Sequence, residues 1–318
     1  MTTDPTSERL PSPAVGGVVV TYHPDAGFET RLAAIAQEVA ALIVVDNSAT
    51  ETDRARLADG CAALGCQLMD NSENRGLGAA LNLGFATLAA RGLTWAIAFD
   101  QDSTPEPGLS RALLATAAQS AAKPVALVGA NWTDEGRPDH PARHLQAHGV
   151  IPGCFRRSAA TRDLSDVTCV IASGTMFHLP TAQRLGGFDE GLFLDLVDTD
   201  YCLRARAAGY TLRVAAAARL RHRRGAKRPV TFAGRTWWPA FMPESRLHGL
   251  FRNRLLVFRR TGWRFPHWAS FEIAYATKIL AEIVFLEDRK SAKLAACLRG
   301  TWAGSIGSRP HRFLPETR

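Results

Sequence analysis

The stretch AVGGVVVTYHPDAGFETRLAAIAQEVAALIVVDN, residues 14–47, decides the fold. It holds two continuously apolar, β-branched runs, 14–24 and 41–47, and each run predicts a buried strand that ends in turn-forming residues. Between them the apolar side chains recur at helical spacing, which predicts a helix over 29–40. A strand, a helix and a second apolar strand form the repeating unit of parallel sheets, so we expect an α/β protein.

The same alternation continues as far as residue 132. Further strands are expected at 66–71, 94–103 and 124–132, and helices at 51–65, 74–92 and 108–121. Strands that are apolar on both faces indicate a mostly parallel, twisted sheet flanked by helices. Ligands of such sheets bind beyond the carboxyl ends of the strands. We therefore expect Tyr22–Asp25, Asp46–Asn47 and Asp100–Asp102 to meet in one crevice.

The second half of the chain has a less regular pattern. Residues 133–166 are polar and hold Pro138 and Pro141, which disfavour a helix, so we expect a loop or flap. That loop carries His140, His144 and His148. Beyond it we expect a strand at 166–179, a loop and helix over 186–210, short strand-like pieces over 211–225, and helices around 244–260 and 270–286.

Composition excludes several classes of protein. A chain of 318 residues that is 46% hydrophobic buries a sizeable core, so disorder is excluded as its main state. No charge-free apolar run approaches the roughly 18–20 residues of a membrane span, and the polar start MTTDPTSERLPSP lacks the features of a signal peptide. We therefore expect a cytosolic chain. Its six cysteines show neither a C-x-x-C pair nor zinc-like spacing, and we expect them to be apolar fillers.

Charge is distributed unevenly along the chain. Residues 1–234 carry 23 lysines and arginines against 24 acids, whereas residues 235–318 carry 15 against 6. A basic region of this kind occurs in proteins that bind nucleic acid or anionic lipid, and in proteins that merely need solubility. Around 244–260 the arginines alternate with apolar side chains. That pattern could belong to a docking helix with its polar face in water, but we favour a helix lying on anionic headgroups.

Acidic side chains follow two of the predicted strands. Asp100 and Asp102 can together hold one hard divalent cation that also touches a diphosphate, although isolated pairs of this kind are commonly solvated turns. Asp46 can accept a hydrogen bond from a base or ribose, or can cap the next helix. His222 lies among arginines that disfavour imidazolium, so it is available to bind a metal, or else it packs at the surface.

Two further segments are candidates for substrate binding. Asn74-Arg75-Gly76 opens a helix whose N-terminus favours phosphate, although Arg75 could equally cover a surface. Asp195, Asp198 and Asp200 lie within six residues and repel one another unless a cation or an acceptor hydroxyl offsets their charge. One of them could serve as a general base, or all three could line a polar helix start.

Taken in order, these segments resemble the family-two glycosyltransferases with the GT-A fold, and in particular the rhamnosyltransferase branch. The resemblance covers about Val15 to Arg260, and its most specific strings are DQDS (100–103) and FLDLVDTDYCLR (193–204). The other matching strings are VTYHPD (20–25), IVVDNS (43–48), NRGLGAALNLG (74–84), ASGTMF (172–177), LRHRRG (220–225) and RNRLLVFRR (252–260).

Composition, charge and the resemblance together predict a division of the chain into four parts. These are a polar leader (1–13), a nucleotide-sugar-binding half (14–132), an acceptor-binding and catalytic half (133–234) and a basic, amphipathic, membrane-facing helical extension (235–318). The resemblance also implies an inverting transfer in which Asp198 removes the acceptor proton. A divalent Mg²⁺ or Mn²⁺ would be held by Asp102 and His222.

The remaining implied roles divide between the two substrates. The donor nucleotide would be bound by Thr21, Tyr22, Asp25, Asp46, Asn74, Arg75, Asp100 and Gln101. The acceptor would be bound by Ser173, Gly174, Asp195, Asp200 and Arg252.

The implied reaction moves a sugar to a lipid-linked saccharide acceptor in the synthesis of a cell-surface polysaccharide. The favoured donor is dTDP-L-rhamnose, with a UDP- or GDP-sugar as the alternative. The enzyme would sit at the inner face of the cell membrane through its basic C-terminal helices, and no nucleic-acid partner is expected. Three rivals remain: a nucleotidyltransferase, for which the glycine-rich loop with lysine is missing, a basic nucleic-acid-binding protein, and an inactive saccharide-binding protein.

The sequence departs from the family pattern at four places. Arg75 replaces the usual lysine and His23 the commoner asparagine. The usual acidic pair at the catalytic base is Val197-Asp198, and the aromatic cluster before Arg252 is thinned to residues 247–251. These differences bear on the identity of the acceptor and of the donor sugar.

Overall fold

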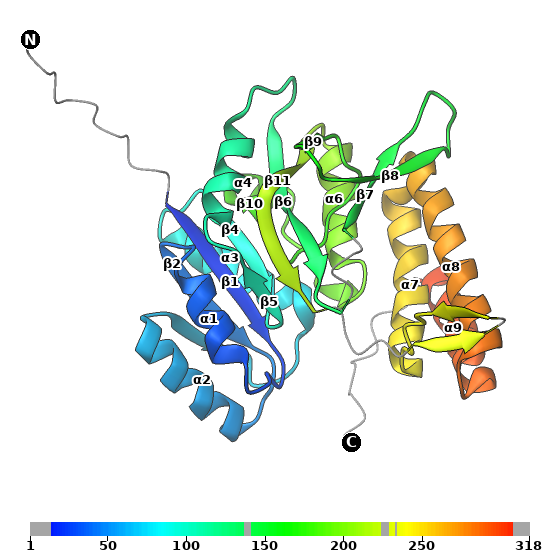
Figure 1. Cartoon of the computed structure of the whole chain (residues 1–318), viewed down its shortest axis with the longest axis horizontal. Helices are drawn as coiled ribbons and strands as arrows, with labels where there is room; N and C mark the ends of the chain where they lie inside the picture. The colour runs from blue at the N-terminus through cyan, green and yellow to red at the C-terminus, as the bar shows by residue number, and fades with distance from the viewer. Residues whose placement is uncertain (1–13, 137–140, 224–228, 233, 308–318) are drawn as a thin grey trace, which may run out of the picture.

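The computed structural model describes residues 14–136, 141–223, 229–232 and 234–307. The polar leader, His140, Pro138 and the residues after 307 lie outside these ranges. A central sheet with helices on both faces makes up the first two thirds of the chain, and three C-terminal helices stand together beside it (Figure 1).

Within the described residues the central sheet has nine strands, in the order β3-β2-β1-β4-β10-β6-β11-β5, and β9 pairs with β11. One side is parallel throughout, because β1 pairs in parallel with β2 and β4, and β2 with β3. Strand β10 runs antiparallel between β4 and β6, while β6 and β11 are parallel. The bounds are β1 Val15–Thr21, β2 Ala41–Asp46, β3 Gln67–Asp70, β4 Trp95–Asp100, β5 Ser103–Pro105, β6 Val125–Asp134, β9 Leu164–Ser165, β10 Thr175–His178 and β11 Thr211–His222.

Each face of the sheet is covered by helices with apolar faces. Side chains of α1, α2 and α4 form one core cluster with the sheet, and those of α3, α5 and α6 form the other. The helix α3 packs close to β1 because Gly84 has no side chain; a Cβ there would lie 2.5 Å from Val18. The bounds are α1 Phe28–Ala36, α2 Glu51–Leu64, α3 Gly76–Ala90, α4 Leu109–Ala118, α5 Leu179–Arg184 and α6 Val197–Ala207.

The structure differs from the sequence-based expectation between residues 133 and 179. The expected flap is largely a β-hairpin, formed by β7 (Arg143–Ala147) and β8 (Phe155–Ala159). His144 is therefore a strand residue, and it is buried with only 4% of its surface exposed. The expected strand over 166–179 is shortened to β10. The expected strand pieces over 211–225 form one long strand, β11, whose pairing with β6 shifts in register.

Three helices, α7 (Glu244–Arg260), α8 (Pro266–Leu286) and α9 (Lys290–Ser305), form the C-terminal extension with a core of their own. The sequence predicted α7 and most of α8 but neither α9 nor the small hairpin of β12 (Val230–Phe232) and β13 (Arg235–Trp237). Helices α7 and α9 approach closely at Gly300, where a Cβ would meet the carbonyl oxygen of His248 at 2.3 Å. In the described ranges, no helix has both the length and the apolarity needed to cross a membrane.

The arginines of α7 bond to other parts of the protein. Arg246 pairs with Asp195, Arg254 with Glu272 of α8, and Arg260 with Asp189. Arg252 is 4% exposed and donates to the carbonyl oxygen of Gly191. The docking interpretation of 244–260 is thus the one that the structure supports, and α7 is not a free basic surface for lipid.

Candidate active site

The carboxyl ends of the parallel strands bring the predicted donor residues together. In the register of the sheet, Thr21 at the end of β1 stands opposite Asp46 at the end of β2. On the other side of β1, Val20 stands opposite Asp100 at the end of β4. The three segments that the sequence assigned to one crevice therefore share one edge of the sheet.

Asp46 is buried and offers one unused oxygen. Its Oδ1 accepts hydrogen bonds from the hydroxyls of Thr21 (2.8 Å) and Ser48 (2.7 Å) and from the backbone N–H of Ser48 (3.1 Å). Its Oδ2 has no hydrogen-bond partner among the residues that the structure describes. A buried acceptor without a donor is uncommon, so this oxygen fits the N–H or O–H group of a ligand.

The turn after β1 is bonded to the turn after β4. The backbone N–H of Tyr22 donates to Oε1 of Gln101 at 2.7 Å, and Nε2 of Gln101 donates back to the carbonyl oxygen of Tyr22 at 3.1 Å. Burial raises the pKa of the Tyr22 hydroxyl, and its hydrogen bond with Asn74 lowers it. Asp25 is turned to Arg31, and their hydrogen bond holds the pKa of the Asp25 carboxyl below its usual range.

Asp100, Asp102 and His222 form a cluster that can hold a metal ion. Each offers one ligand atom, and these atoms lie within 4.8 Å of one another. Nε2 of His222 is 3.9 Å from Oδ2 of Asp100, and Nδ1 of His222 is 3.2 Å from Oδ1 of Asp102. Two carboxylates and one imidazole make a donor set suited to Mn²⁺ or Mg²⁺. The residues alone had offered Asp100 and Asp102 as a pair for one cation, whereas the resemblance assigned Asp100 to the nucleotide; the geometry places it with Asp102 and His222.

The electrostatics of this cluster favour a bound cation. The pKa of Asp100 is raised to about 6: desolvation is the largest cause, the charge of His222 acts in the opposite direction, and the carboxylates of Asp102 and Asp198 add to the increase. Carboxylates that repel one another at the edge of the sheet are stabilised when a cation neutralises them.

Two serines that the sequence analysis did not assign to the metal support this cluster. Ser103 Oγ lies 3.0 Å from Nδ1 of His222 and 2.6 Å from Oγ of Ser173. Ser173 in turn accepts from the backbone N–H of Asp100 at 3.1 Å. Ser173 is 2% exposed, so its hydroxyl bonds within the protein, and its predicted contact with an acceptor stays a prediction. The DQDS string already contained Ser103, and only the pairing of β5 with β11 reveals its role.

Asp198 lies in the first turn of α6. Its carboxylate accepts from the backbone N–H groups of Thr199 (2.7 Å) and Ala172 (3.3 Å). Burial raises its pKa, the two hydrogen bonds lower it, and the charge of Asp195 raises it. A carboxylate whose pKa is raised toward neutrality is better suited to accept a proton than an exposed one.

The other predicted acceptor residues lie within the protein framework. Asp200 is 1% exposed and bonds to Arg204 at 2.7 Å. Arg252 bonds to a backbone carbonyl, and a Cβ at Gly174 would lie 2.7 Å from Leu220. Asp195 forms a bidentate contact with Arg246. All four residues thus pack against or bond to protein groups, and their contact with an acceptor stays a prediction.

The start of α3 also differs from the expectation. The N–H of Leu77 donates to the carbonyl oxygen of Phe193 at 2.7 Å, and the N–H of Gly76 donates to Oδ1 of Asn74 at 3.0 Å. A Cβ at Gly76 would lie 2.5 Å from the same carbonyl oxygen. The glycine thus permits close packing of residues 189–196, and these two N–H groups already have acceptors other than phosphate. Arg75 remains half exposed.

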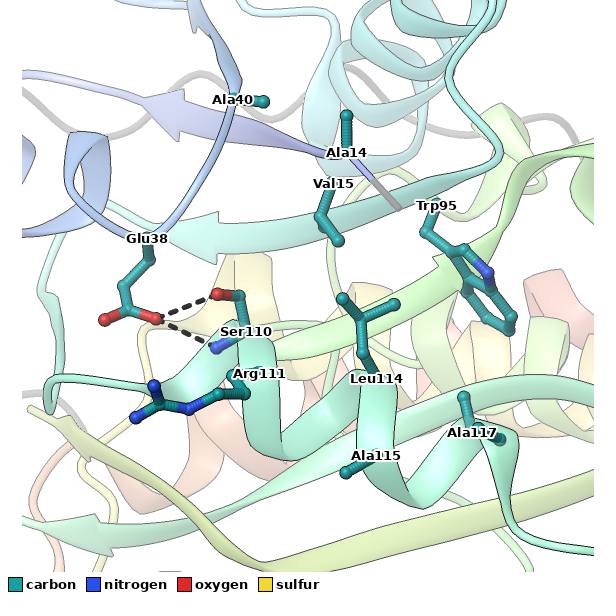
Figure 2. A pocket seen from close by; sticks show the side chains of 11 residues that line it. Ala14, Val15, Glu38, Ala40, Trp95, Ser110, Arg111, Leu114, Ala115 and Ala117 are labelled. Carbon is teal, nitrogen blue, oxygen red and sulfur yellow. Dashed lines mark hydrogen bonds between the residues drawn. The ribbon is translucent and has the colours of Figure 1, made fainter. Parts of the chain in front are cut away.

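A separate cavity of about 620 Å³ lies at the opposite end of the strands (Figure 2). Trp95 and Val15 line it at the starts of β4 and β1, and Leu114 of α4 closes one side. Its carboxylate, Glu38, is occupied by the N–H and hydroxyl of Ser110. This cavity is therefore distinct from the crevice that holds the acidic cluster.

Comparison with known proteins identifies the family. The sequence model described as Glycosyl transferase family 2 matches residues 18–184. The chain belongs to glycosyl transferase family 2. The matched range contains the Asp46 site and both acids of the DQDS string, whereas Asp198 and His222 follow it.

Similar proteins include a curated dTDP-rhamnosyl transferase and a solved structure of similar fold. The family-two chain is 27% identical over 245 residues to the dTDP-rhamnosyl transferase RfbF of Shigella flexneri, covering 76% of this chain and 79% of that protein. Its fold is similar to that of S. aureus TarS 1–349, with a TM-score of 0.56 and 10% identity over 92% of this chain and 80% of that one.

Two structures with bound ligands share this fold. TarS 1–349 in complex with UDP-GlcNAc has a TM-score of 0.51 and 9% identity, covering 93% of this chain and 92% of that one. GalNAc-T7 with UDP, GalNAc and Mn²⁺ has a TM-score of 0.56 and 14% identity, covering 77% of this chain and 48% of that one. The predicted family, GT-A fold and glycosyltransferase class are confirmed.

Proposed function

We propose that this glycosyltransferase moves L-rhamnose from dTDP-L-rhamnose to a saccharide acceptor by a single inverting displacement. The observation that carries the proposal is the juxtaposition of the unused Asp46 oxygen with the cluster of Asp100, Asp102 and His222 at one edge of the sheet. A nucleotide base and a diphosphate need these two kinds of partner. The 27% identity to a dTDP-rhamnosyl transferase supports the choice of sugar.

The nucleotide would bind in the half formed by residues 14–132. Thymine and uracil carry an N–H at position 3 that can donate to Oδ2 of Asp46, and the turn of Tyr22 and Gln101 would line the same pocket. A UDP-sugar satisfies this contact as well as dTDP does. It is therefore the second candidate donor, supported by the similar fold of TarS bound to UDP-GlcNAc.

Asp100, Asp102 and His222 would hold Mg²⁺ or Mn²⁺. Such a cation neutralises the charge of the departing nucleoside diphosphate. Two serines hold the metal ligands in place: Ser103 bonds to His222, and Ser173 accepts from the backbone N–H of Asp100. We also propose that residues 133–234 provide the acceptor side, although His222 from this half completes the donor cluster.

Asp198 would act as the general base. It would take the proton of the acceptor hydroxyl as the oxygen attacks the anomeric carbon from the face opposite the leaving diphosphate. Burial supports this role because it raises the pKa of the carboxyl group, and the two backbone hydrogen bonds support it because they fix the carboxylate in place.

The acceptor would be a lipid-linked saccharide, and the enzyme would sit at the inner face of the cell membrane. Support comes from the excess of cationic residues in 235–318 and from large apolar side chains exposed on α8 and α9. Those side chains are Ile273, Val284 and Phe285 of α8, Leu298 and Trp302 of α9, and Ile306 directly after α9. Helices α8 and α9, and not α7, would therefore face the lipid.

The membrane role is tested by flotation with phosphatidylglycerol vesicles. The double variant Phe285→Ser, Trp302→Ser should lose vesicle binding and keep nucleotide binding. Val150→Ser is the matched control, because Val150 is fully exposed on the β7–β8 hairpin. Vesicle binding unchanged in the double variant would contradict a role for α8 and α9.

The donor site is tested by calorimetric titration with dTDP, UDP and GDP, each with and without Mn²⁺, on the wild type and Asp102→Ala. We expect dTDP binding that depends on the metal and weakens in the variant. Preference for UDP or GDP would keep the transferase and discard rhamnose. Failure to bind any nucleoside diphosphate, together with salt-sensitive binding of duplex DNA, would favour the nucleic-acid-binding alternative.

A further inference from the structure

The segment before Asp198 has a strained backbone. Phe193 has φ 64° and ψ −63°, and Leu196 has φ 66°. Residues other than glycine rarely adopt a positive φ, and this conformation persists only where the surrounding structure holds it. Leu196 is the residue immediately before α6, so its conformation sets the direction in which the helix, and with it Asp198, begins.

Helix α7 of the C-terminal extension holds this segment. Nδ2 of Asn253 donates to the carbonyl oxygens of Leu192 (2.7 Å) and Asp195 (2.8 Å). The neighbouring Arg252 donates to the carbonyl oxygen of Gly191 at 3.1 Å. Asn253 is 1% exposed, so these bonds form in a water-poor interface.

One ion pair and one backbone hydrogen bond from α3 also hold residues 189–196. Arg246 of α7 bonds to the carboxylate of Asp195 at 3.0 Å. From the opposite side, the N–H of Leu77 donates to the carbonyl oxygen of Phe193. Residues 189–196 are thus held between the donor half and the extension, two parts that are distant in sequence.

We propose that Asn253 is a positioning residue for sugar transfer. Its amide donates to the two carbonyl oxygens that directly precede the strained residues Phe193 and Leu196. These bonds would fix the start of α6 and with it the carboxylate of Asp198. The inference rests on the proposed role of Asp198 as the base. It makes α7 a part of the catalytic framework and not only a link to α8 and α9.

The decisive variant is Asn253→Asp. It keeps the size of the side chain and the oxygen that accepts from Arg252, and it removes both donated bonds. Arg259→Ala is the matched control. Arg259 lies on the same helix and also donates to backbone carbonyls, but those of Gly304 and Ser305 in α9.

Two measurements separate positioning from simple destabilisation. The first is hydrogen exchange of the backbone amides of 189–200, which should become faster in Asn253→Asp and stay unchanged in Arg259→Ala. The second is the hydrolysis of dTDP-L-rhamnose with Mn²⁺. We expect kcat to fall about 100-fold with KM unchanged, because a displacement of about 1 Å at a reacting group can cost that much.

Equal losses in both variants, or a kcat within threefold of wild type, would overturn the inference. If Asn253→Asp does not fold, Arg246→Ala replaces it, because Arg246 is nearly half exposed and its loss should be tolerated. The kcat of Arg246→Ala should fall, and Arg246→Lys should keep a larger part of the wild-type kcat. A wild type that hydrolyses no nucleotide sugar, or an Asp198→Asn variant with full activity, would refute the proposed function. The exchange data would still decide whether α7 holds the loop.

Discussion

Replacing Asp46 by asparagine tests how the protein recognises the base. The two carboxylate oxygens have different surroundings: three donors meet Oδ1, and Oδ2 has no partner among the described residues. An asparagine can present its oxygen to the three donors and turn its NH₂ group to the position of Oδ2. Folding should therefore be preserved while the atom that faces the ligand changes from an acceptor to a donor.

The size of the effect follows from that single atom. A hydrogen bond to a charged acceptor contributes roughly 1.5–3 kcal/mol. Since about 1.4 kcal/mol corresponds to a factor of ten in affinity, Asp46→Asn should bind dTDP roughly 10- to 100-fold more weakly. Cytosine carries an acceptor at N3 in place of the N–H, so CDP should lose much less, and the preference for dTDP over CDP should shrink.

The assay is calorimetric titration with dTDP and CDP in the presence of Mn²⁺. Asp70→Asn is the matched control, because Asp70 is the register neighbour of Asp46 on β3 and bonds to Arg54. Its dTDP affinity should stay within twofold of wild type. The reasoning would be refuted if Asp46→Asn bound dTDP as wild type does, or if both variants lost the same affinity.

Three further predictions concern the metal, the extension and the hairpin. The pKa of Asp100 is raised to about 6, and a cation binds the ionised form, so the affinity for Mn²⁺ should fall about tenfold between pH 7 and 5. Paramagnetic resonance measures this affinity, and Asp102→Asn should abolish binding. Gly300→Ala would place a Cβ 2.3 Å from the carbonyl oxygen of His248 and should lower the free energy of unfolding in urea by about 1–3 kcal/mol. Gly60→Ala, with no contact closer than 4.0 Å, should raise it by about 0.5–1 kcal/mol, because alanine favours a helix more than glycine does; stabilisation of similar size by both variants would contradict close packing at Gly300. The pKa of His144 in the folded protein is lowered from 6.5 to about 4, mainly by burial and secondly by the charge of Arg157. As the pH falls below 6.5, His144 is therefore protonated in the unfolded chain before it is protonated in the folded one. Stability should therefore drop between pH 6.5 and 4, and His144→Phe should remove roughly 2 kcal/mol of the loss between pH 7 and 5; a pH dependence unchanged in that variant would show that other groups cause it.

The different surroundings of Asp198 and Asp200 could not be predicted from the sequence. Both acids belong to the same string, and both were predicted to face substrates. Residues two apart on a helix point in different directions, so the start of α6 decides which acid turns to Ala172 and which to Arg204. That start depends on the αL residue Leu196, and therefore on α7, which is distant in sequence.

The arginines of α7 show the same limit on another scale. Their spacing was compatible with lipid or with protein as the partner, because a helical stripe of charge is the same in both cases. Asp189, Asp195 and Glu272, with which they pair, lie elsewhere in the chain. His144 was likewise assigned to a loop, because the hairpin of β7 and β8 is closed by pairing that a polar pattern does not reveal.

The alternation of strands and helices, the family, and the edge of the sheet where the acids gather could all be predicted from the amino-acid sequence. These follow from local periodicity and from short strings at the ends of strands. The tertiary structure decided which oxygen of Asp46 is unused, which acids join His222, and what holds the turn before Asp198. Such properties depend on desolvation and on hydrogen bonds between distant segments, and both arise only when the chain packs.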